Sequence, residues 1–414
     1  MSGRNPVRLQ PRRVRLAYLV SHPIQYQAPL LRRLALEPDI DLTVFFASDF
    51  SVRGYRDEGF GVDVQWDVPL LDGYRHVFLP RIRDGNDVSF LTPLNRGILH
   101  ALKGSGTQPG FDVLWVHGYA TANSLHGMLA AKVLGIPVML RSESWLRDRG
   151  RSATKLAAKR LFFAGLASLV DAVLPIGTLN SEYWSYYFGE SIPQFLVPYA
   201  VDNEYFSQRA REAQPARNQL AAELGLDPAR PVILFASKLQ QRKNCSHLIE
   251  AHARVVSTCC TDVPYLVIVG DGEQREALER QAAATALDSI RFAGFRNQSE
   301  LPRFFDLASV FVLPSRHEPW GLVVNEVMNA ARPVIVSDDI GCAPDLVEDG
   351  VSGFIYPTGN IDALTQALRK ALASPTTAQQ MGANAYARIQ QWGIEQDIQG
   401  IRRALEHLAP SFAA

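Results

Sequence analysis

Short apolar runs alternate with longer amphipathic stretches along the whole 414-residue chain. Apolar runs bounded by turn residues are typical of strands buried in a parallel sheet, and the stretches between them are typical of covering helices. In the first half the expected strands are 15–20, 42–47, 77–79, 113–117, 138–140, 173–175 and 195–197. In the second half they are 232–236, 266–269, 290–292, 310–313, 334–336 and 353–356. Two such sets predict two doubly wound α/β domains rather than one large sheet.

Composition narrows the class of protein without naming a function. Apolar residues make up 47% of the chain and charged residues 20%, as in soluble globular enzymes. The 42 acidic and 42 basic residues balance, so no global charge favours a nucleic-acid partner. The four cysteines, Cys245, Cys259, Cys260 and Cys342, form no CxxC pair, which fits a reducing compartment.

Nothing in the sequence has the marks of a membrane anchor. Residues 1–13 are polar and contain Arg4, Arg8, Arg12 and Arg13, and they lack the apolar core of a secretory signal. No apolar run reaches the ~18 residues needed to cross a bilayer. We therefore expect a cytoplasmic protein that is soluble or peripheral to a membrane.

Two carboxylates, Glu318 and Glu326, stand eight positions apart across an expected strand–turn–helix unit. Glu318 follows the strand 310–313, and Glu326 lies about two turns into the next helix. The amides of Gly321, Leu322 and Val323 are expected to point out of that helix, where free N–H groups and the positive dipole end suit phosphate oxygens. This combination suits a ligand that carries both phosphates and hydroxyls, as a nucleotide sugar does.

The segment from Phe311 to Tyr356 resembles the donor-binding half of the family 4 retaining glycosyltransferases, which carry a Glu-x7-Glu signature. The matching motifs, in order, are Pro319-Trp320-Gly321, Arg332-Pro333-Val334-Ile335, Gly341-Cys342-Ala343-Pro344-Asp345 and Asp349-Gly350-Val351-Ser352-Gly353. The chain departs from the family at Asn325, at Ala331-Arg332 and at Asp345, which concerns packing more than chemistry.

The resemblance implies the GT-B fold, in which two doubly wound, Rossmann-like domains face a central cleft. An acceptor-binding domain is expected over residues 1–205 and a nucleotide-sugar donor-binding domain over 206–390. The polar stretch Ser207–Pro228 is the expected linker, although its Arg211–Leu226 part could be helical. A last helix, about 391–414, would return to the first domain, with Trp392 either anchoring the crossing or serving as an ordinary core residue.

The resemblance also assigns roles around the donor. Glu326 would accept hydrogen bonds from the ribose hydroxyls, and Glu318 would lie beside the hydroxyls of the donor sugar. Lys238 and Lys243 follow the strand 232–236 where the family binds the diphosphate, although the family usually has Arg where this chain has Lys238. Two fixed cations would stabilise the negative charge on the departing phosphate. The alternative is a solvated basic loop, and Arg242 is a substitute partner.

Two further segments would line the nucleotide end of the cleft. Gly270 and Gly272 follow the strand 266–269, where glycine permits either a close backbone approach to a ligand or simply a tight turn. The strand around Phe292 to Phe295 stands where the family reads the edge of the base with backbone groups.

The first domain offers polar residues at three expected strand ends. His117 ends the strand 113–117, and in the family the equivalent histidine approaches the donor sugar and the reaction centre; a satisfied structural histidine is the alternative. The loop containing His22, Gln25 and Tyr26 lacks the family's glycine-rich turn, suits an acceptor, and resembles bacterial surface-polysaccharide biosynthesis members. Glu143 could orient an acceptor hydroxyl or pair with Arg141.

The sequence shows no metal-ligand cluster, which agrees with departure of the diphosphate without a metal, and we expect no cofactor beyond the donor substrate. The stretch Trp145–Val170, with Arg147-Leu166 at its centre, mixes basic and apolar residues, as a membrane-surface helix does, although a solvated basic face is the commoner case.

The resemblance therefore implies a retaining hexosyltransferase that moves a sugar from a UDP- or GDP-linked donor to a glycan, lipid-linked or small-molecule acceptor, in polysaccharide or glycoconjugate biosynthesis. Two other classes stay open at this point. A nucleotide-sugar epimerase of the same fold would need paired acid/base groups around the sugar. A non-catalytic nucleotide-sugar-binding protein would bind the donor without transferring it.

Overall fold

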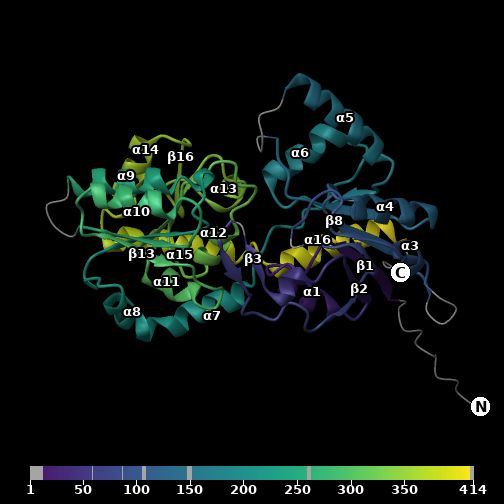
Figure 1. Ribbon diagram of the computed structural model, residues 1–414, viewed down its shortest axis with the longest axis horizontal. Helices are drawn as coiled ribbons and strands as arrows, with labels where there is room; N and C mark the ends of the chain where they lie inside the picture. Colours follow the sequence, from purple (N-terminus) through teal and green to yellow (C-terminus); the bar gives the residue numbers. More distant parts are fainter. Residues whose placement is uncertain are drawn as a thin grey trace, which may run out of the picture.

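A computed structural model describes residues 13–57, 59–85, 87–104, 109–146, 152–258 and 263–410. Several residues considered in the sequence analysis lie outside these ranges, namely Arg4, Arg8, Arg12, Arg147, Arg149, Arg151, Cys259 and Cys260. Two separate six-stranded parallel sheets form the two halves of the molecule, which confirms the predicted GT-B class of fold (Figure 1).

The N-terminal sheet has β1 at its centre. In spatial order its strands are β10 (Ala172–Val173), β9 (Val138–Arg141), β8 (Val113–His117), β1 (Val14–Val20), β2 (Ile40–Phe46) and β5 (Arg75–Phe78). Its helices are α1 (Ala28–Ala35), α2 (Phe50–Arg53), α3 (Ile98–Lys103), α4 (Ala122–Val133), α5 (Ala153–Ala167), α6 (Thr178–Phe188) and α16 (Ile394–Leu408). The chain leaves β1 in one direction and returns to build β8 on its other side, so β1 and β8 flank the topological switch point.

The C-terminal sheet repeats this plan around β11. Its strands in order are β13 (Ile290–Gly294), β12 (Tyr265–Val269), β11 (Val232–Ala236), β14 (Val310–Leu313), β15 (Val334–Ser337) and β16 (Gly353–Tyr356). Its helices are α7 (Asn203–Ala213), η1 (Gln214–Ala216), α8 (Arg217–Glu223), η2 (Gln241–Lys243), α9 (Cys245–Val256), α10 (Arg275–Ala284), α11 (Leu301–Leu307), α12 (Leu322–Met328), α13 (Ala343–Leu346), α14 (Ile361–Ala371) and α15 (Pro375–Ile389). Here the switch point lies between β11 and β14.

Both faces of each sheet are buried, which explains why the strands read as continuous apolar runs. In β11, Leu234 and Ala236 join the hydrophobic core on one face, and Ile233 and Phe235 join the core on the other. The period of two along a strand puts successive side chains into different cores, so neither set can be polar.

The local structure differs from what we expected in three places. The segment 195–197 forms no strand, although Phe195 N–H and Val197 N–H donate to the carbonyls of Val173 and Pro175. Two short antiparallel hairpins were not expected, and they are β3 (Tyr55–Asp57) with β4 (Val62–Val64), and β6 (Arg81–Arg83) with β7 (Leu94–Asn95).

The third place is the stretch Ser207–Pro228, which we expected to be a linker. Most of Ser207–Pro228 is helical and packed, because Phe206, Leu220 and Ala221 enter the core of the C-terminal domain. Arg217 also pairs with the buried Asp306 through two bonds, of 2.5 and 2.8 Å. The alternative of a helix within this stretch was therefore the better interpretation.

The last helix, α16, lies in the N-terminal half of the molecule, next to α1 (Figure 1). Ile398, Ile401 and Leu405 enter the same core as β1 and β2. A buried ion pair of 3.4 Å joins Arg141 of β9 to Asp397 of α16. Just before the helix, Trp392 stacks on Trp320 with ring centroids 5.7 Å apart, so this tryptophan lies where the chain passes between the domains.

The two departures from the family pattern at Asn325 and Asp345 are contacts between the domains. Asn325 accepts a bond from Trp320 Nε1 and donates to the carbonyl of Tyr199, both at 2.9 Å. Asp345 accepts bonds from the backbone N–H and the hydroxyl of Thr178, at the start of α6. These side chains fix how the two sheets face each other.

Candidate functional site

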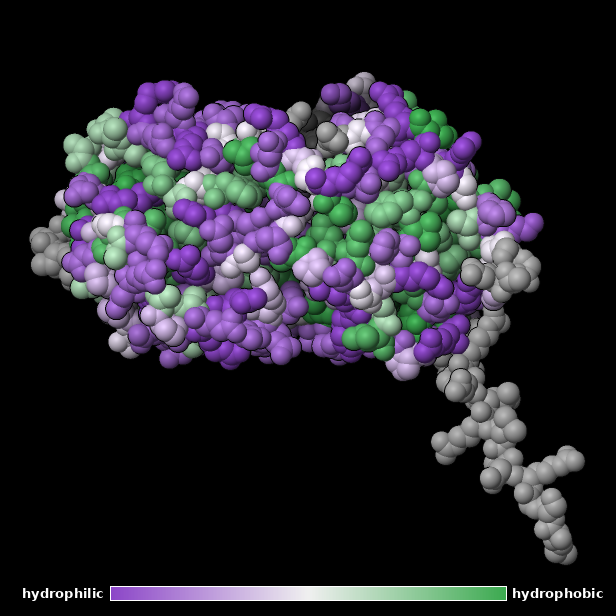
Figure 2. Space-filling view, turned by 60° about the horizontal axis from the view of Figure 1, so that its bottom comes forward, coloured by the Kyte–Doolittle hydropathy of each residue, from purple (hydrophilic) through white to green (hydrophobic). Residues whose placement is uncertain are grey.

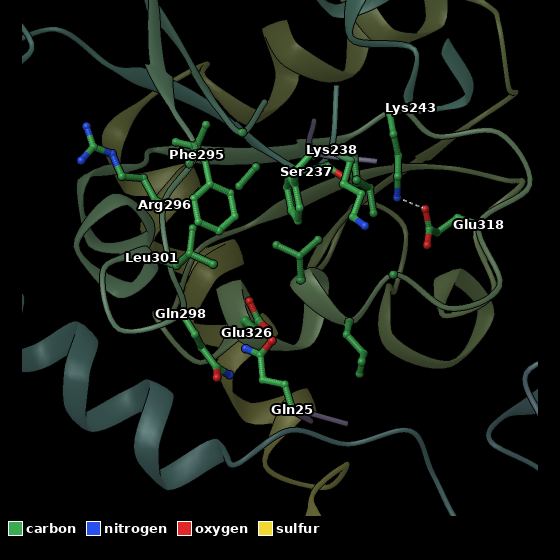
Figure 3. A pocket seen from close by; sticks show the side chains of 18 of the residues that line it. Gln25, Ser237, Lys238, Lys243, Phe295, Arg296, Gln298, Leu301, Glu318 and Glu326 are labelled. Atoms are coloured by element: carbon green, nitrogen blue, oxygen red, sulfur yellow. Dashed lines mark hydrogen bonds and ion pairs between the residues drawn. The ribbon is translucent and has the colours of Figure 1, made fainter. Parts of the chain in front are cut away.

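A cavity of about 330 Å³ lies at the carboxyl ends of β11 and β14, where an open parallel sheet binds ligands. Most of its wall comes from the C-terminal domain, and Gln25, Phe60 and Trp66 come from the N-terminal domain. Of the predicted residues it gathers Lys238, Lys243, Gly270, Phe295, Glu318, Gly321, Leu322, Val323, Glu326 and Gln25. Figure 3 shows aromatic and aliphatic side chains at one end of this cavity and the Lys243–Glu318 pair at the other.

A buried ion pair in the cavity joins Lys243 to Glu318. Lys243 Nζ donates to Glu318 Oε2, and the two side chains are only 8% and 13% exposed. Arg242 Nη1 lies 3.2 Å from the same oxygen. Burial lowers the pKa of Lys243, and the Glu318 carboxylate opposes that shift. The carboxylate therefore helps to keep this buried ammonium group charged.

Local backbone geometry places this pair. Asn244 follows Lys243 in a left-handed conformation, with φ of 50°, and its side-chain amide donates to the carbonyl of Pro314 at 3.0 Å. That bond ties the loop after β11 to the loop after β14. His317, also left-handed with φ of 53°, donates its backbone N–H to Asp339 and turns the chain toward Glu318.

Glu326 lies in the second turn of α12 and lines the cavity. It has no hydrogen-bond or ion-pair partner within the described part of the chain. Burial raises the pKa of Glu326 to about 8. A carboxyl group held in a pocket without a donor is poised to accept hydrogen bonds from a ligand that carries hydroxyl groups. Gln25, from the other domain, lines the same cavity (Figure 3).

Lys238 is held by the N-terminal domain. Its Nζ lies 2.7 and 2.8 Å from the two carboxylate oxygens of Asp57, at the end of β3. Although partial burial opposes ionisation of Asp57, the bonds from Lys238 and from the amides of Phe60 and Gly59 hold the pKa of this carboxyl below its usual value. An anionic ligand that used Lys238 would compete with Asp57 for this ammonium group.

The turn after β12 requires glycine at positions 270 and 272, because other backbone segments pack closely against it. A Cβ on Gly270, which has φ of 130°, would lie 2.0 Å from the carbonyl oxygen of Ser237. A Cβ on Gly272 would lie 2.8 and 2.9 Å from the carbonyl oxygens of Leu239 and Gly59. Gly270 lines the cavity, whereas Gly272 does not; it makes room for the hairpin of the other domain.

Phe292 does not line the cavity, because its side chain packs into the core on the other face of the sheet. The reading of the base edge by backbone groups of this strand stays a prediction. Phe295 does line the cavity, just beyond the end of β13. The cavity also contains residues that we did not predict, namely Phe60, Trp66, Ser237, Arg296, Gln298 and Leu301. Arg296, Gln298 and Leu301 follow the predicted strand end, so that position was a usable signal. Trp66 ends the alternating run Val62-Asp63-Val64-Gln65-Trp66, which is a strand signal that our predictions did not use. Phe60 lies in the turn before this run, and no sequence pattern marked it.

The residues predicted for the N-terminal side form a second cluster. Glu143 accepts hydrogen bonds from Tyr26, at 2.9 Å, and from Tyr199, and its Oε1 lies 3.7 Å from His117 Nε2. His117 in turn lies 3.1 Å from the side-chain amide of Gln27. Glu143 does not pair with Arg141, which was one of the two alternatives.

His22 lies at the edge of this cluster. Its Nδ1 is 2.9 Å from the hydroxyl of Ser21, and its ring packs on Phe50 with centroids 4.4 Å apart. Burial and the neighbouring His117 lower the pKa of His22 to about 4. None of His22, Tyr26, His117 and Glu143 lines the cavity, and Gln25 is the predicted N-terminal residue that does.

Two facing Rossmann-like domains, with a cavity of cations, carboxylates and aromatic rings between them, define a protein of the GT-B glycosyltransferase class of fold. Residues 216–388, within the C-terminal domain, match the family model described as glycosyl transferases group 1.

Relatives agree with this class. The chain is 31% identical over 175 residues to alpha-D-kanosaminyltransferase of Streptomyces kanamyceticus. The aligned residues cover 42% of this chain and 44% of that protein. It is 29% identical over 287 residues to alpha-maltose-1-phosphate synthase of Mycobacterium tuberculosis. This alignment covers 64% of this chain and 72% of that protein. The chain thus spans less than half of the length of the first of these relatives.

Among solved structures, Anabaena HepE in complex with UDP and glucose superposes with a TM-score of 0.68 and 18% identity, over 95% of this chain and all of that one. At this identity the likeness concerns the fold.

Proposed function

We propose that the protein is a retaining glycosyltransferase that moves a sugar from a nucleoside-diphosphate sugar, UDP- or GDP-linked, to a glycan, lipid-linked or small-molecule acceptor in polysaccharide or glycoconjugate biosynthesis. One observation carries the proposal. A single cavity at the switch point of the C-terminal sheet joins a buried lysine–glutamate pair, a second lysine and Glu326, whose carboxyl group has no partner among the described residues. The relatives are named as sugar transferases and synthases, which supports the same activity.

The donor would lie along the cavity according to its chemistry. The ribose hydroxyls would pair with Glu326, and the diphosphate would reach Lys243, Lys238 and the first amides of α12, which have no partner within the helix. The donor sugar would lie beside Glu318, toward His117. Charge-assisted bonds to both lysines would hold the two phosphates in a part of the cleft from which water is largely excluded.

The reaction would need little from the protein beyond positioning and charge. The bond between the anomeric carbon and the diphosphate oxygen breaks, and the acceptor oxygen bonds to the same face of that carbon. The proton of the acceptor hydroxyl passes to the departing diphosphate oxygen. Lys243 and Lys238 stabilise the charge that grows on that oxygen, and they do so most strongly in the transition state. We propose that this departure needs no metal ion.

A thermal-shift panel of UDP-, GDP-, ADP- and dTDP-sugars tests the proposal, with and without EDTA. A ligand that binds only the folded protein raises the melting temperature. We expect one nucleotide to stabilise the protein in EDTA, and Glu326→Ala to abolish that shift. Glu276→Ala, at a position whose side chain is 88% exposed, is the matched control and should keep the full shift. No stabilisation by any of the four would contradict the proposal. Incubation with donor alone, followed by analysis of the sugar, separates transfer from epimerisation.

We further propose that the protein works at the inner membrane surface. Within the described residues, no helix has the length and apolarity to cross a bilayer. Among the large apolar side chains that are exposed there, only Val351 lies outside residues 36–196, and Figure 2 shows apolar side chains gathering over the N-terminal half. On α5, Leu161 is 77% exposed and stands beside Lys159 and Arg160.

Flotation with anionic liposomes tests the membrane proposal. We expect the protein to float with vesicles that contain an anionic lipid and to stay in solution with neutral ones. Leu161→Gln should weaken flotation. Leu36→Gln, at a side chain that is 75% exposed on the end of α1, should not. Equal recovery with and without lipid would overturn this part of the proposal and leave the transferase proposal untouched.

A further inference from the structure

The hairpin of β3 and β4 has an unusual position for an element of the N-terminal domain. It forms its own two-stranded sheet, separate from the six-stranded sheet of its domain. A two-stranded hairpin is marginally stable by itself, so its conformation depends on the surface against which it packs. Here part of that surface belongs to the C-terminal domain.

Contacts on both sides of the aromatic residues dock this segment on the C-terminal domain. Before Phe60, Asp57 pairs with Lys238. After Phe60, the side-chain amide of Asn297 donates to the carbonyl of Gln65 at 2.7 Å. Asp67 then accepts bonds from the hydroxyl and the backbone N–H of Ser299. Residue 57 and residues 59–67 are thus held against the loops that follow β11 and β13.

This docking brings Phe60 and Trp66 into the wall of the cavity. The ring of Phe60 meets that of Phe295 edge to face, with centroids 4.8 Å apart, and Lys238 Nζ lies 4.7 Å from the centre of the Phe60 ring. Phe60 therefore stands between the cationic part of the cavity and its aromatic end. Such an arrangement fits a ligand in which a flat ring is joined to phosphates.

We propose that Phe60 and Trp66 complete the nucleobase subsite from the N-terminal domain, so that the base of the donor is bound between residues of both domains and only while the hairpin is docked. The inference rests on the proposed function and deepens it. Aromatic side chains bind bases through stacking, which tolerates different bases because each has a π-face. Base identity would then be read by the segment after β13, and base affinity would come in part from the hairpin.

Calorimetric titration with UDP, GDP and inorganic pyrophosphate tests the inference on the full chain. Pyrophosphate has the phosphates without the base, so it separates contacts with the base from effects on the lysines. We expect Phe60→Ala to weaken the nucleoside diphosphate that the wild type prefers by about 5- to 100-fold. Pyrophosphate affinity should stay unchanged. Trp66→Ala should act in the same direction, and Phe60→Tyr should retain most of the affinity.

The matched control is Phe90→Ala, because Phe90 is 56% exposed in the same domain and does not line the cavity. Melting temperatures of all variants verify that each is folded. Unchanged nucleotide affinity in both Phe60→Ala and Trp66→Ala would overturn the inference. Equal weakening of nucleotide and pyrophosphate would also overturn it, since the ring would then act through Lys238. Failure of the wild type to bind either nucleotide would instead overturn the proposed function, and the inference with it.

Discussion

Glu143 and His117, at the ends of the neighbouring strands β9 and β8, face each other with Oε1 and Nε2 3.7 Å apart. Tyr26 and Tyr199 donate to the same carboxylate. Although burial opposes ionisation, His117 and the two tyrosines hold the pKa of Glu143 below its usual value. The carboxylate is thus a fixed charge that orients the imidazole, and it is not free to take up a proton near neutral pH.

Glu143→Gln should therefore act on turnover. The amide keeps the shape of the side chain and loses the charge that positions His117. We expect kcat for transfer, or for hydrolysis of the donor, to fall by about 10- to 100-fold, while nucleotide affinity stays within about twofold of the wild type. Tyr26→Phe, which removes one of the bonds to Glu143, should give a smaller loss in the same direction. Equal losses in kcat and in affinity would point to a general structural effect.

The raised pKa of Glu326 would make the proposed nucleotide binding depend on pH. In the free protein the carboxyl keeps its proton up to about pH 8. Ribose hydroxyls that donate to it favour the ionised form, so binding should release a proton. The Kd should fall as pH rises toward about 8, by at most about tenfold per pH unit, and should level off above that value.

Glu326→Gln isolates this effect, because the phosphates of the ligand titrate equally in both proteins. Calorimetry in two buffers of different ionisation enthalpy counts the proton that is released. The same raised pKa also makes the free energy of unfolding depend on pH. The folded protein holds a proton that the unfolded chain loses near 4.5, so stability should fall as pH rises from about 4.5 to about 8, and the glutamine variant should lack that fall. Parallel pH profiles for the two proteins would show that Glu326 does not bind the ligand.

Substitutions at Lys243 and at Glu318 should affect different quantities, namely ligand affinity and kcat. Lys243→Met removes a charge-assisted contact with the diphosphate, and we expect pyrophosphate and donor affinity to fall by about 10- to 100-fold. Glu318→Gln releases Lys243 from its ion pair, so pyrophosphate should bind at least as well as in the wild type while kcat falls. Steady-state kinetics beside pyrophosphate titration measures the split. A loss of pyrophosphate affinity in both variants would contradict it.

The folds of the two sheets were predictable because each strand is buried on both faces. Leu234 and Ile233 enter different cores, and a fully apolar run is the direct consequence. The helix α7 was not recognised because its exposed face carries most of its charged residues, and only Phe206, Ser207 and Ala210 are buried. Its stability comes from packing on α11, which no local pattern reveals.

The cavity was predictable as far as it lies at strand ends. Lys243, Glu318 and Phe295 each follow a buried strand, and the parallel topology brings such positions together. Phe60 could not be found in this way, since its place depends on a contact between domains that are far apart in the sequence. The same holds for the partner of Lys238, because Asp57 lies 181 positions earlier.

The pair formed by Asp57 and Lys238 gives the last prediction. Diphosphate and Asp57 compete for the same ammonium group, so Asp57→Asn should strengthen binding of inorganic pyrophosphate. The side chains are 10% and 33% exposed, and for such a partly solvated pair we expect a gain of about 2- to 5-fold. The asparagine keeps an oxygen that can accept the bonds from Gly59 and Phe60, which preserves the turn. Asp67→Asn is the matched control, since it loosens the same segment without touching Lys238, and should leave pyrophosphate affinity unchanged. In a Lys238→Met background the gain from Asp57→Asn should disappear. A gain that persists there would mean that Asp57 repels the anion directly, with no competition for the lysine.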